Sequence, residues 1–148
     1  MEKYEEKEME FDSLVGRKVL SATINDKKDF IVLDTDKGVL YLTWVGDCCA
    51  QCFLAHVNGT CFLIGHTITK VENTEWRTVR GGRDKYDITE GLGTTIYTDI
   101  GTVTFESRVV HNGYYSGMIN ISDDEPMDQY HSPRYNWKEE KLSVLKDF

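Results

Sequence analysis

Short runs of apolar, β-branched and aromatic residues with a period near two dominate the first third of the chain. These runs lie at residues 19–24, 30–33 and 39–44, and polar turn sequences at 25–28 and 36–38 separate them. A period of two places alternate side chains on the same face of a strand. The pattern therefore predicts three antiparallel strands joined as a meander.

The same period continues, with interruptions, to residue 121. Residues 49–57 alternate as a fourth strand would, and residues 60–65 are expected to form a tight helical turn or a buried connector. Further strands are predicted at 66–76, 94–99, 102–110 and 116–121. Residues 78–93 are rich in glycine and charge, so we expect a long mobile loop there.

The two ends of the chain depart from this pattern. Helix-forming residues fill positions 1–14, and Leu142 and Leu145 share one face of a helix predicted at 137–145. We divide the chain into an acidic N-terminal extension (1–13), a β-rich core domain (14–122) and an acidic, aromatic C-terminal tail with a short helix (123–148). The predicted fold is mainly β, with α+β as the alternative: a curled antiparallel sheet, closed as a barrel or folded into a sandwich, with short terminal helices.

Composition and charge exclude several functional classes. No apolar run in the 148 residues approaches the roughly 20 residues that a membrane-spanning helix needs. The net charge of −8 argues against general nucleic-acid binding, and reflects either solubility or a partner with a basic surface. Residues 1–12 carry six carboxylates, unlike the basic start of a secretory signal, so we expect a cytoplasmic protein.

Four cysteines, at positions 48, 49, 52 and 61, raise the question of a metal or a nucleophile. Cysteine thiolates are preferred zinc ligands, but the sequence has only one Cys-x-x-Cys pair. Reduced and buried thiols are therefore the favoured interpretation. A nucleophilic Cys48 or Cys49, assisted by a histidine at 56, 66 or 111, is the alternative. Asp47 opposes it, because a neighbouring carboxylate raises a thiol pKa. We predict no metal, no cofactor and no catalytic residues.

Three features are candidates for binding a ligand or partner. Asp47 ends the third predicted strand, where its carboxylate either accepts backbone N–H groups or holds a ligand. Residues 111–117 (HNGYYSG) fit a hairpin loop whose tyrosines serve for packing or as exposed anchors. Residues 77–85 form the basic island of this acidic chain, suited to closing over a phosphate. The candidate binding residues are Asp47, Cys48, Cys49, Arg77, Arg80, Arg83, His111, Asn112, Tyr114 and Tyr115.

Two motifs occur in a fixed order, GDCC at 46–49 and NGYYSG at 112–117. Together with LVGRK at 14–18 and LIGHTITKVE at 63–72, they resemble a widespread family of bacteriophage proteins of unknown function, over residues 14–122. The resemblance implies a phage or prophage origin and a small β-rich domain, but it supplies no activity. Ala50 departs from the polar or acidic residue expected there, and the tail from Asp123 lies outside the common pattern.

Three functional hypotheses follow. In the first, a phage accessory protein in the host bacterial cytoplasm counters a defence system by non-catalytic binding to a host protein with a basic surface. In the second, the protein sequesters a nucleotide-type immune signal, with Tyr114 or Tyr115 stacked on a base and Arg83 holding phosphate. In the third, which the sequence favours least, it hydrolyses such a signal. The oligomeric state stays open, with a homo-oligomer among the alternatives.

Overall fold

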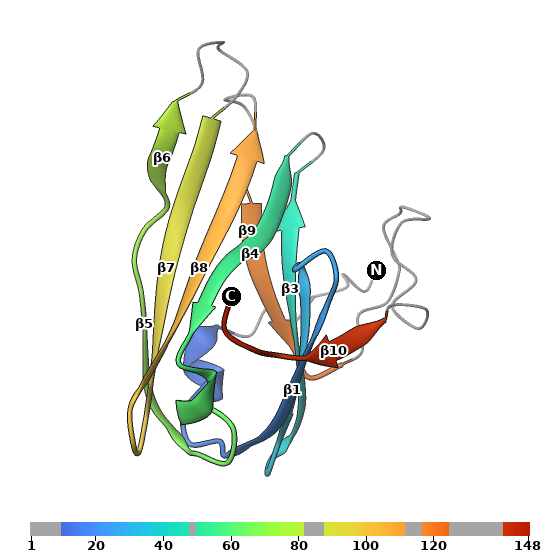
Figure 1. The fold of residues 1–148 in the computed structure, drawn as a ribbon, viewed down its shortest axis with the longest axis vertical. Coiled ribbons are helices and arrows are strands. Elements are labelled where there is room, and N and C mark those ends of the chain that lie inside the picture. Colours follow the sequence, from blue (N-terminus) through green and yellow to red (C-terminus); the bar gives the residue numbers. More distant parts are fainter. Residues whose placement is uncertain (1–9, 48–49, 82–87, 112–116, 125–140) are drawn as a thin grey trace, which may run out of the picture.

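A computed structural model describes residues 10–47, 50–81, 88–111, 117–124 and 141–148. Within these residues, ten strands and two short 3-10 turns form two antiparallel sheets that pack face to face (Figure 1). The mainly β prediction is confirmed. Of the two predicted forms, the sandwich is correct, because the strands stay in two separate sheets and do not close into a barrel.

The first sheet has the strand order β10-β1-β2-β3-β9. Its centre is the predicted meander, in which β1 (Val19–Asn25), β2 (Phe30–Thr35) and β3 (Gly38–Gly46) pair in sequence order. β9 (Gly117–Ser122) pairs with β3 along one edge, and β10 (Leu142–Val144) pairs with β1 along the other. The sheet is thus completed by two strands from the last third of the chain.

The second sheet has the order β4-β8-β7-β5, with β6 paired to β7 as well. β4 (Gln51–Asn58) lies beside β8 (Thr102–His111), and β8 pairs with β7 (Ile88–Thr98) over ten residue pairs. β5 (Ile68–Asn73) and β6 (Arg77–Gly81) follow each other along the far edge of β7. This long β7–β8 hairpin is the backbone of the second sheet (Figure 1).

The prediction of a long loop over residues 78–93 is wrong at both of its ends. Residues 78–81 belong to β6 and residues 88–93 to β7, while 82–87 lie outside the described residues. Glycine weakens the strand pattern of this segment in the sequence, but Gly91 leaves space in the folded strand for neighbouring side chains. A Cβ at Gly91 would lie 2.7 Å from Nη1 of Arg108 and 2.8 Å from Cγ2 of Val79. Glycine is therefore compatible with a strand here, because it leaves space for the arginine.

The predicted terminal helices are replaced by other structures where the chain is described. Phe11–Leu14 forms a single 3-10 turn, η1, and residues 1–9 lie outside the described part. The helix expected at 137–145 is wrong over Leu142–Val144, which form β10, because pairing with the edge of β1 overrides a weak helical pattern. The tight turn expected at 60–65 is confirmed as η2 (Thr60–Phe62), which begins after Gly59 at a φ of 91°.

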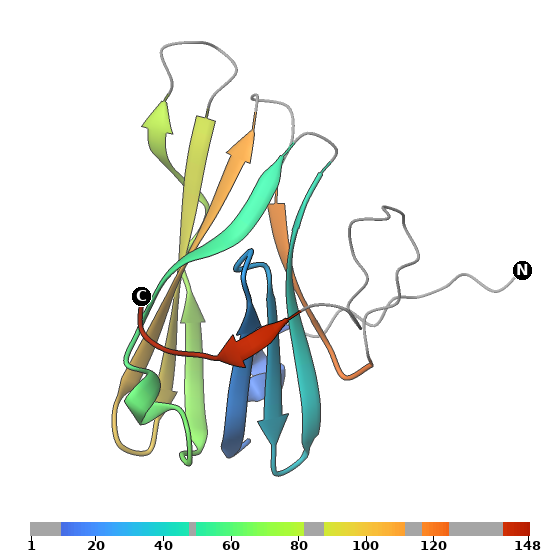
Figure 2. The same cartoon turned by 45° about the vertical axis from the view of Figure 1, so that its right-hand side comes forward.

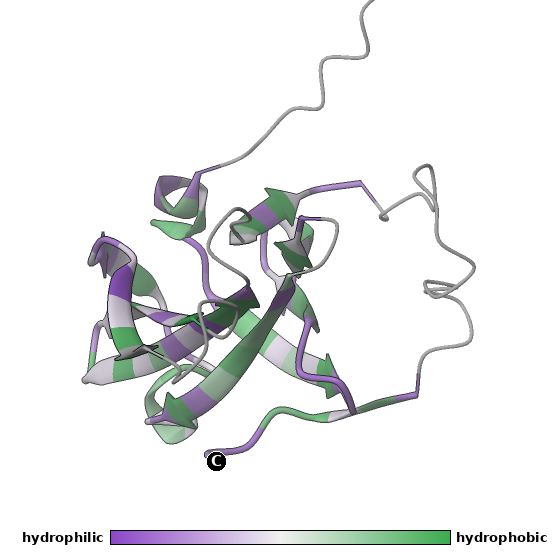
Figure 3. Cartoon of the chain, turned by 90° about the horizontal axis from the view of Figure 1, so that it is seen from above, coloured by the Kyte–Doolittle hydropathy of each residue, from purple (hydrophilic) through white to green (hydrophobic). Residues whose placement is uncertain are grey.

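One hydrophobic core fills the space between the sheets, and hydrophobic and hydrophilic positions alternate along the strands that enclose it (Figure 3). A polar bond crosses this core. Nε1 of Trp44 on β3 donates to Oγ of Ser107 on β8 at 2.8 Å, and both residues are buried. The hydrogen bond ties the two sheets together at a fixed position. Among the described residues, no helix has the length and apolar character needed to span a bilayer.

Candidate functional site

The strand ends that flank three connections lie together at one end of the sandwich, which we call the loop end (Figures 1 and 2). The register explains this grouping. Gly46 at the end of β3 pairs with Gly117 at the start of β9, and Ile88 at the start of β7 pairs with both Gly81 and His111. The strands that carry GDCC and NGYYSG are therefore adjacent, and the connection between β6 and β7 starts beside them. The flanking residues are Gly46, Gln51, Gly81, Ile88, His111 and Gly117.

Glycines in both motifs allow the chain to pack closely at the loop end. A Cβ at Gly46 would lie 2.3 Å from the carbonyl oxygen of Ala50. A Cβ at Gly117 would lie 2.7 Å from Sγ of Cys52 on the opposite sheet. Real Cβ atoms do not approach other atoms this closely, so each glycine has a steric reason within the fold. These motif glycines therefore shape the scaffold from which the connections extend.

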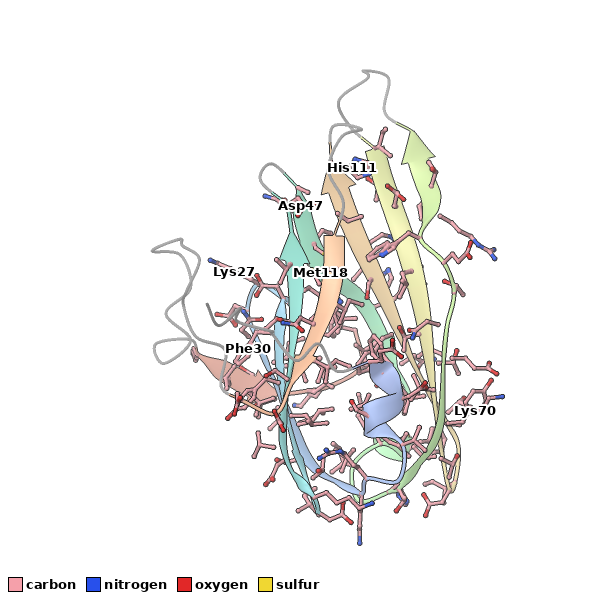
Figure 4. The ribbon with its side chains drawn as sticks, turned by 180° about the vertical axis from the view of Figure 1, so that it is seen from behind. Lys27, Phe30, Asp47, Lys70, His111 and Met118 are labelled. Atoms are coloured by element: carbon pink, nitrogen blue, oxygen red, sulfur yellow. The ribbon has the colours of Figure 1, made fainter. Side chains whose placement is uncertain are left out.

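His111 lies at the loop end but is directed into the sandwich, where it is only 6% exposed. Its Nε2 is in hydrogen-bond contact with Oε1 of Glu90 on β7, and the two residues form an ion pair when the histidine is protonated. Along β8, His111 shares the inward face with Val109 and Ser107, which are also buried. The interior thus changes from apolar to polar towards this end, where Figure 4 labels both His111 and Asp47.

Sequence reasoning missed Glu90 because it fell in the predicted loop. The signal was present in the chain: Glu90 stands two residues before Leu92 and Leu92 two before Thr94, in the period of a strand. Once residues 88–98 are one strand paired with 102–111, Ile88 pairs with His111, and Glu90 stands two residues further along β7, on the same face of the sheet. The contact between Glu90 and His111 depends on the register in which β7 pairs with β8, and the pattern of a single segment does not reveal that register.

Of the other candidate residues, the structure describes only a few. Asp47 is exposed directly after β3, where its carbonyl oxygen accepts a hydrogen bond from the N–H of Ala50 at 2.6 Å. Arg77 is exposed at the start of β6, four residues from the loop end, and the backbone of Arg80 pairs with Thr89. The remaining candidates lie outside the described residues: Cys48, Cys49, Arg83, Asn112, Tyr114 and Tyr115, together with the side chain of Arg80.

The two described cysteines differ in environment. Cys52 is buried on β4, and burial, reinforced by the negative charge of Asp29, raises the pKa of its thiol to about 12. At neutral pH this thiol is protonated and is a poor nucleophile or metal ligand. Cys61 is exposed in η2, at the other end of the sandwich. Within the described parts of the chain, no group of three or more metal-ligating side chains comes together.

A groove of about 260 Å³ runs beside the loop end, between η1, β7 and β9. Apolar side chains dominate it, among them Trp76, Leu92 and Ile119. Asp47, Arg77 and His111 do not line it. Its volume is just below the roughly 300–1,000 Å³ of ordinary small-molecule pockets. The full lining is Phe11, Asn73, Trp76, Leu92, Gly117, Met118 and Ile119.

Comparison with known proteins identifies a family but no activity. Residues 12–121 match the family model described as a domain of unknown function, DUF7448. This match covers all of β1 to β8 and nearly all of η1 and β9, and it ends before β10. Neither the curated proteins nor the solved structures give a match to the chain. The protein therefore belongs to the DUF7448 family.

Proposed function

We propose that this protein acts by non-catalytic binding, and that the loop end engages a host protein. One observation carries the proposal: three connections that are far apart in sequence start and finish at the same end of one sandwich. A rigid sheet scaffold that presents several loops at one end is a common way to build a binding surface. The loops provide the chemistry, and the strands fix their spacing.

The residues of these connections are of the kinds that recur at protein interfaces. Tyr86 stands in the connection 82–87, and Tyr114 and Tyr115 stand in 112–116. Arg83 and Asn112 accompany them. Tyrosine and arginine dominate the binding energy at many interfaces, because they offer large contact areas together with polar ends. This composition supports a protein partner as the target of the loop end.

Charge and resemblance narrow the kind of partner. The net charge of −8 favours a basic surface on the partner, and such a pair associates more weakly as salt rises. The resemblance to bacteriophage proteins directs the search to bacterial defence proteins. We accordingly propose that the protein is a phage-encoded inhibitor that binds, through its loop end, a defence component with a basic surface.

The test is an affinity capture from the bacterial host with matched variants as baits. The wild-type protein, a Tyr114→Ala and Tyr115→Ala double variant, and an Ile100→Ser variant are immobilised at low and high salt. Ile100 is 53% exposed in the β7–β8 turn at the opposite end of the sandwich, so its replacement controls for general surface changes. We expect a defence protein to bind the wild type and Ile100→Ser, and its recovery to fall at least about tenfold with the double variant, as for loss of interface anchors.

Two outcomes would contradict the proposal. One is the absence of any partner that distinguishes the loop-end variant from the control, even at low salt. The other is a thermal shift of the protein with cyclic or ADP-ribose-type nucleotides that Arg83→Ala abolishes, which would favour sequestration of a signal. The groove gives that second function less support, because it is small and mainly apolar and neither Asp47 nor Arg77 lines it.

A further inference from the structure

The last eight residues, 141–148, form a strap that joins the two sheets (Figure 2). The strap first adds β10 to the free edge of β1, where Val144 pairs with Thr23 and Leu142 with Asn25. It then continues to β4 in the second sheet, where the backbone of Phe148 exchanges two hydrogen bonds with Val57, both of 3.0 Å. Most of this attachment uses backbone groups, as in the addition of a strand to a sheet.

One apolar side chain anchors the strap. Leu145 is 2% exposed and belongs to the hydrophobic core, and its N–H donates to the carbonyl oxygen of Ala22 at 3.0 Å. By contrast, Leu142 is 38% exposed and Val144 is 66% exposed. The strap therefore fills a single apolar socket, while its neighbouring apolar residues contribute little burial.

A carboxylate provides the second side-chain contact. Oδ1 of Asp147 accepts hydrogen bonds from the N–H of Thr60 at 2.9 Å and from its Oγ1 at 2.7 Å. These bonds, with one from the N–H of Gly59, lower the pKa of Asp147 below its ordinary value. The ammonium group of Lys28 lies 4.8 Å from the centre of the Phe148 ring. Leu145 thus occupies an apolar socket, and Asp147, two residues later, accepts hydrogen bonds from two donors of Thr60.

The residues that receive the strap belong to the family domain, but the strap itself does not. Ala22, Val57 and Thr60 lie within residues 12–121, whereas the strap begins twenty residues after that match ends. An exposed strand edge, one apolar socket and one carboxylate-binding position are together the elements of a site for an extended peptide. We propose that this slot is a peptide-binding site of the domain, specific for an extended segment with leucine two residues before aspartate, and that the strap is its built-in occupant.

The tether determines when an external peptide can enter the slot. Because the strap belongs to the same chain as the slot, it competes at the effective concentration of a tethered ligand, which is about millimolar for a short tether. A free peptide at micromolar concentration is therefore excluded from the intact chain. It binds once the strap is released, by proteolysis or by loss of its anchor.

The experiment uses the whole folded protein with a specific protease site introduced between Asp124 and Lys141. After cleavage, a fluorescently labelled peptide KLSVLKDF, the sequence of residues 141–148, is added and its anisotropy measured. We expect saturable binding to the cut protein, at least tenfold weaker binding to the uncut protein, and displacement by unlabelled KLSVLKDF. Competitor peptides with the Leu145→Asp or Asp147→Asn change should displace the label at least tenfold and several-fold less well, respectively.

A second preparation avoids dependence on cleavage. In the full chain with Leu145→Asp, the strap loses its anchor, and the labelled wild-type peptide should bind and raise the melting temperature. The proposal is overturned if neither preparation binds the peptide, or if the Leu145→Asp peptide competes as well as the wild type. After the same cleavage, the loop-end double variant should bind the peptide as well as the cut wild type does, so this result is independent of the proposed function.

Discussion

The two ends of the sandwich are joined in different ways. At the base, opposite the loop end, backbone groups connect the sheets: the N–H of Gly16 bonds to the carbonyl oxygen of Ile68 at 2.8 Å, and that of Gly65 to Val19 at 2.7 Å. Away from the base, side chains also link the sheets, through the packing of Cys52 against Gly117 and the Trp44–Ser107 bond, beside one backbone bond from the N–H of Leu54 to the carbonyl oxygen of Lys28 at 2.7 Å. Backbone bonds tolerate many sequences, whereas this packing depends on particular residues.

The two ends of the domain therefore have different structural roles. The base holds the fold together, and its turns are short and closed by local hydrogen bonds such as the N–H of Thr98 to the carbonyl of Gly101 at 2.8 Å. The loop end presents three connections from strands that are fixed below them. A binding surface requires such a division, because its loops must vary while their attachment points stay in place.

The sharpest test of this comparison contrasts one thiol from each end. The rise in the pKa of Cys52 from 9.0 to about 12 lowers its thiolate fraction at neutral pH about 1,000-fold, whereas Cys61 at the base is exposed. Iodoacetamide should therefore label Cys61 rapidly and leave Cys52 unmodified in the native protein, as measured by peptide mass spectrometry. Equal labelling of the two would mean that β4 opens readily at the loop end.

The same shift predicts a change of stability at alkaline pH. Between pH 9 and 12 the folded protein holds the Cys52 proton more tightly than the unfolded chain does. The stability that comes from the neutral thiol is therefore complete below pH 9 and is lost as pH rises through 12. A Cys52→Ala variant should lose less stability than the wild type over this range in urea unfolding.

At the base, removal of a buried side chain should have a large effect on stability. Leu63 is fully buried just after η2, so Leu63→Ala should lower the free energy of unfolding by about 2–5 kcal/mol through lost burial and a cavity. The adjacent Ile64 is 37% exposed and provides the control. Ile64→Ala should cost clearly less in the same urea titration. Similar losses of stability for both variants would show that the buried position of Leu63 does not contribute more to the fold than the exposed position of Ile64 does.

At the loop end, the corresponding test adds a Cβ atom to a glycine that is closely packed. Gly117→Ala should destabilise the protein by about 1–3 kcal/mol, since its Cβ would lie 2.7 Å from Sγ of Cys52. Gly93→Ala is the control, because its Cβ meets nothing nearer than 3.6 Å. Cys52→Ala should restore part of the loss in the double variant. If the combined effects are simply additive, the contact between the sheets does not cause the destabilisation.

Local patterns were sufficient for the strands whose pairing is local. The meander of residues 19–44 follows from its period of two and its turns, and β1 to β3 form as predicted. The pattern was insufficient at residues 88–93, where glycines belong to a strand because Arg108 needs the space opposite Gly91. The alternation at Glu90 and Leu92 indicates a strand, but because Arg108 lies on another strand, residues 78–93 alone do not explain why glycines fit into it.

The candidate site was likewise predictable where it depends on local sequence patterns, but not where it depends on pairing between strands. Asp47 and His111 stand next to turn signals, and the strands before them end at the same end of the sandwich. The burial of His111 against Glu90 follows from the register of β7 and β8 and could not be deduced from either segment alone. β10 shows the largest departure, since three residues form a strand only because β1 has a free edge.

The smallest expected effect concerns the exposed carboxylate that closes the strap near the base. The hydrogen bonds from Thr60 and Gly59 lower the pKa of Asp147, so its contribution to stability is present above the ordinary pKa and disappears as pH falls through the lowered value. Asp147→Asn should therefore reduce the melting temperature slightly at pH 7, and the difference from the wild type should shrink as pH falls below the ordinary aspartate pKa of 3.8. Asp123→Asn, an exposed acidic residue that follows β9, removes the same charge without touching Thr60 and should leave the pH 7 melting temperature nearly unchanged. A difference for Asp147→Asn that stays undiminished throughout an acid titration would show that packing, rather than the charged hydrogen bonds, holds this part of the strap.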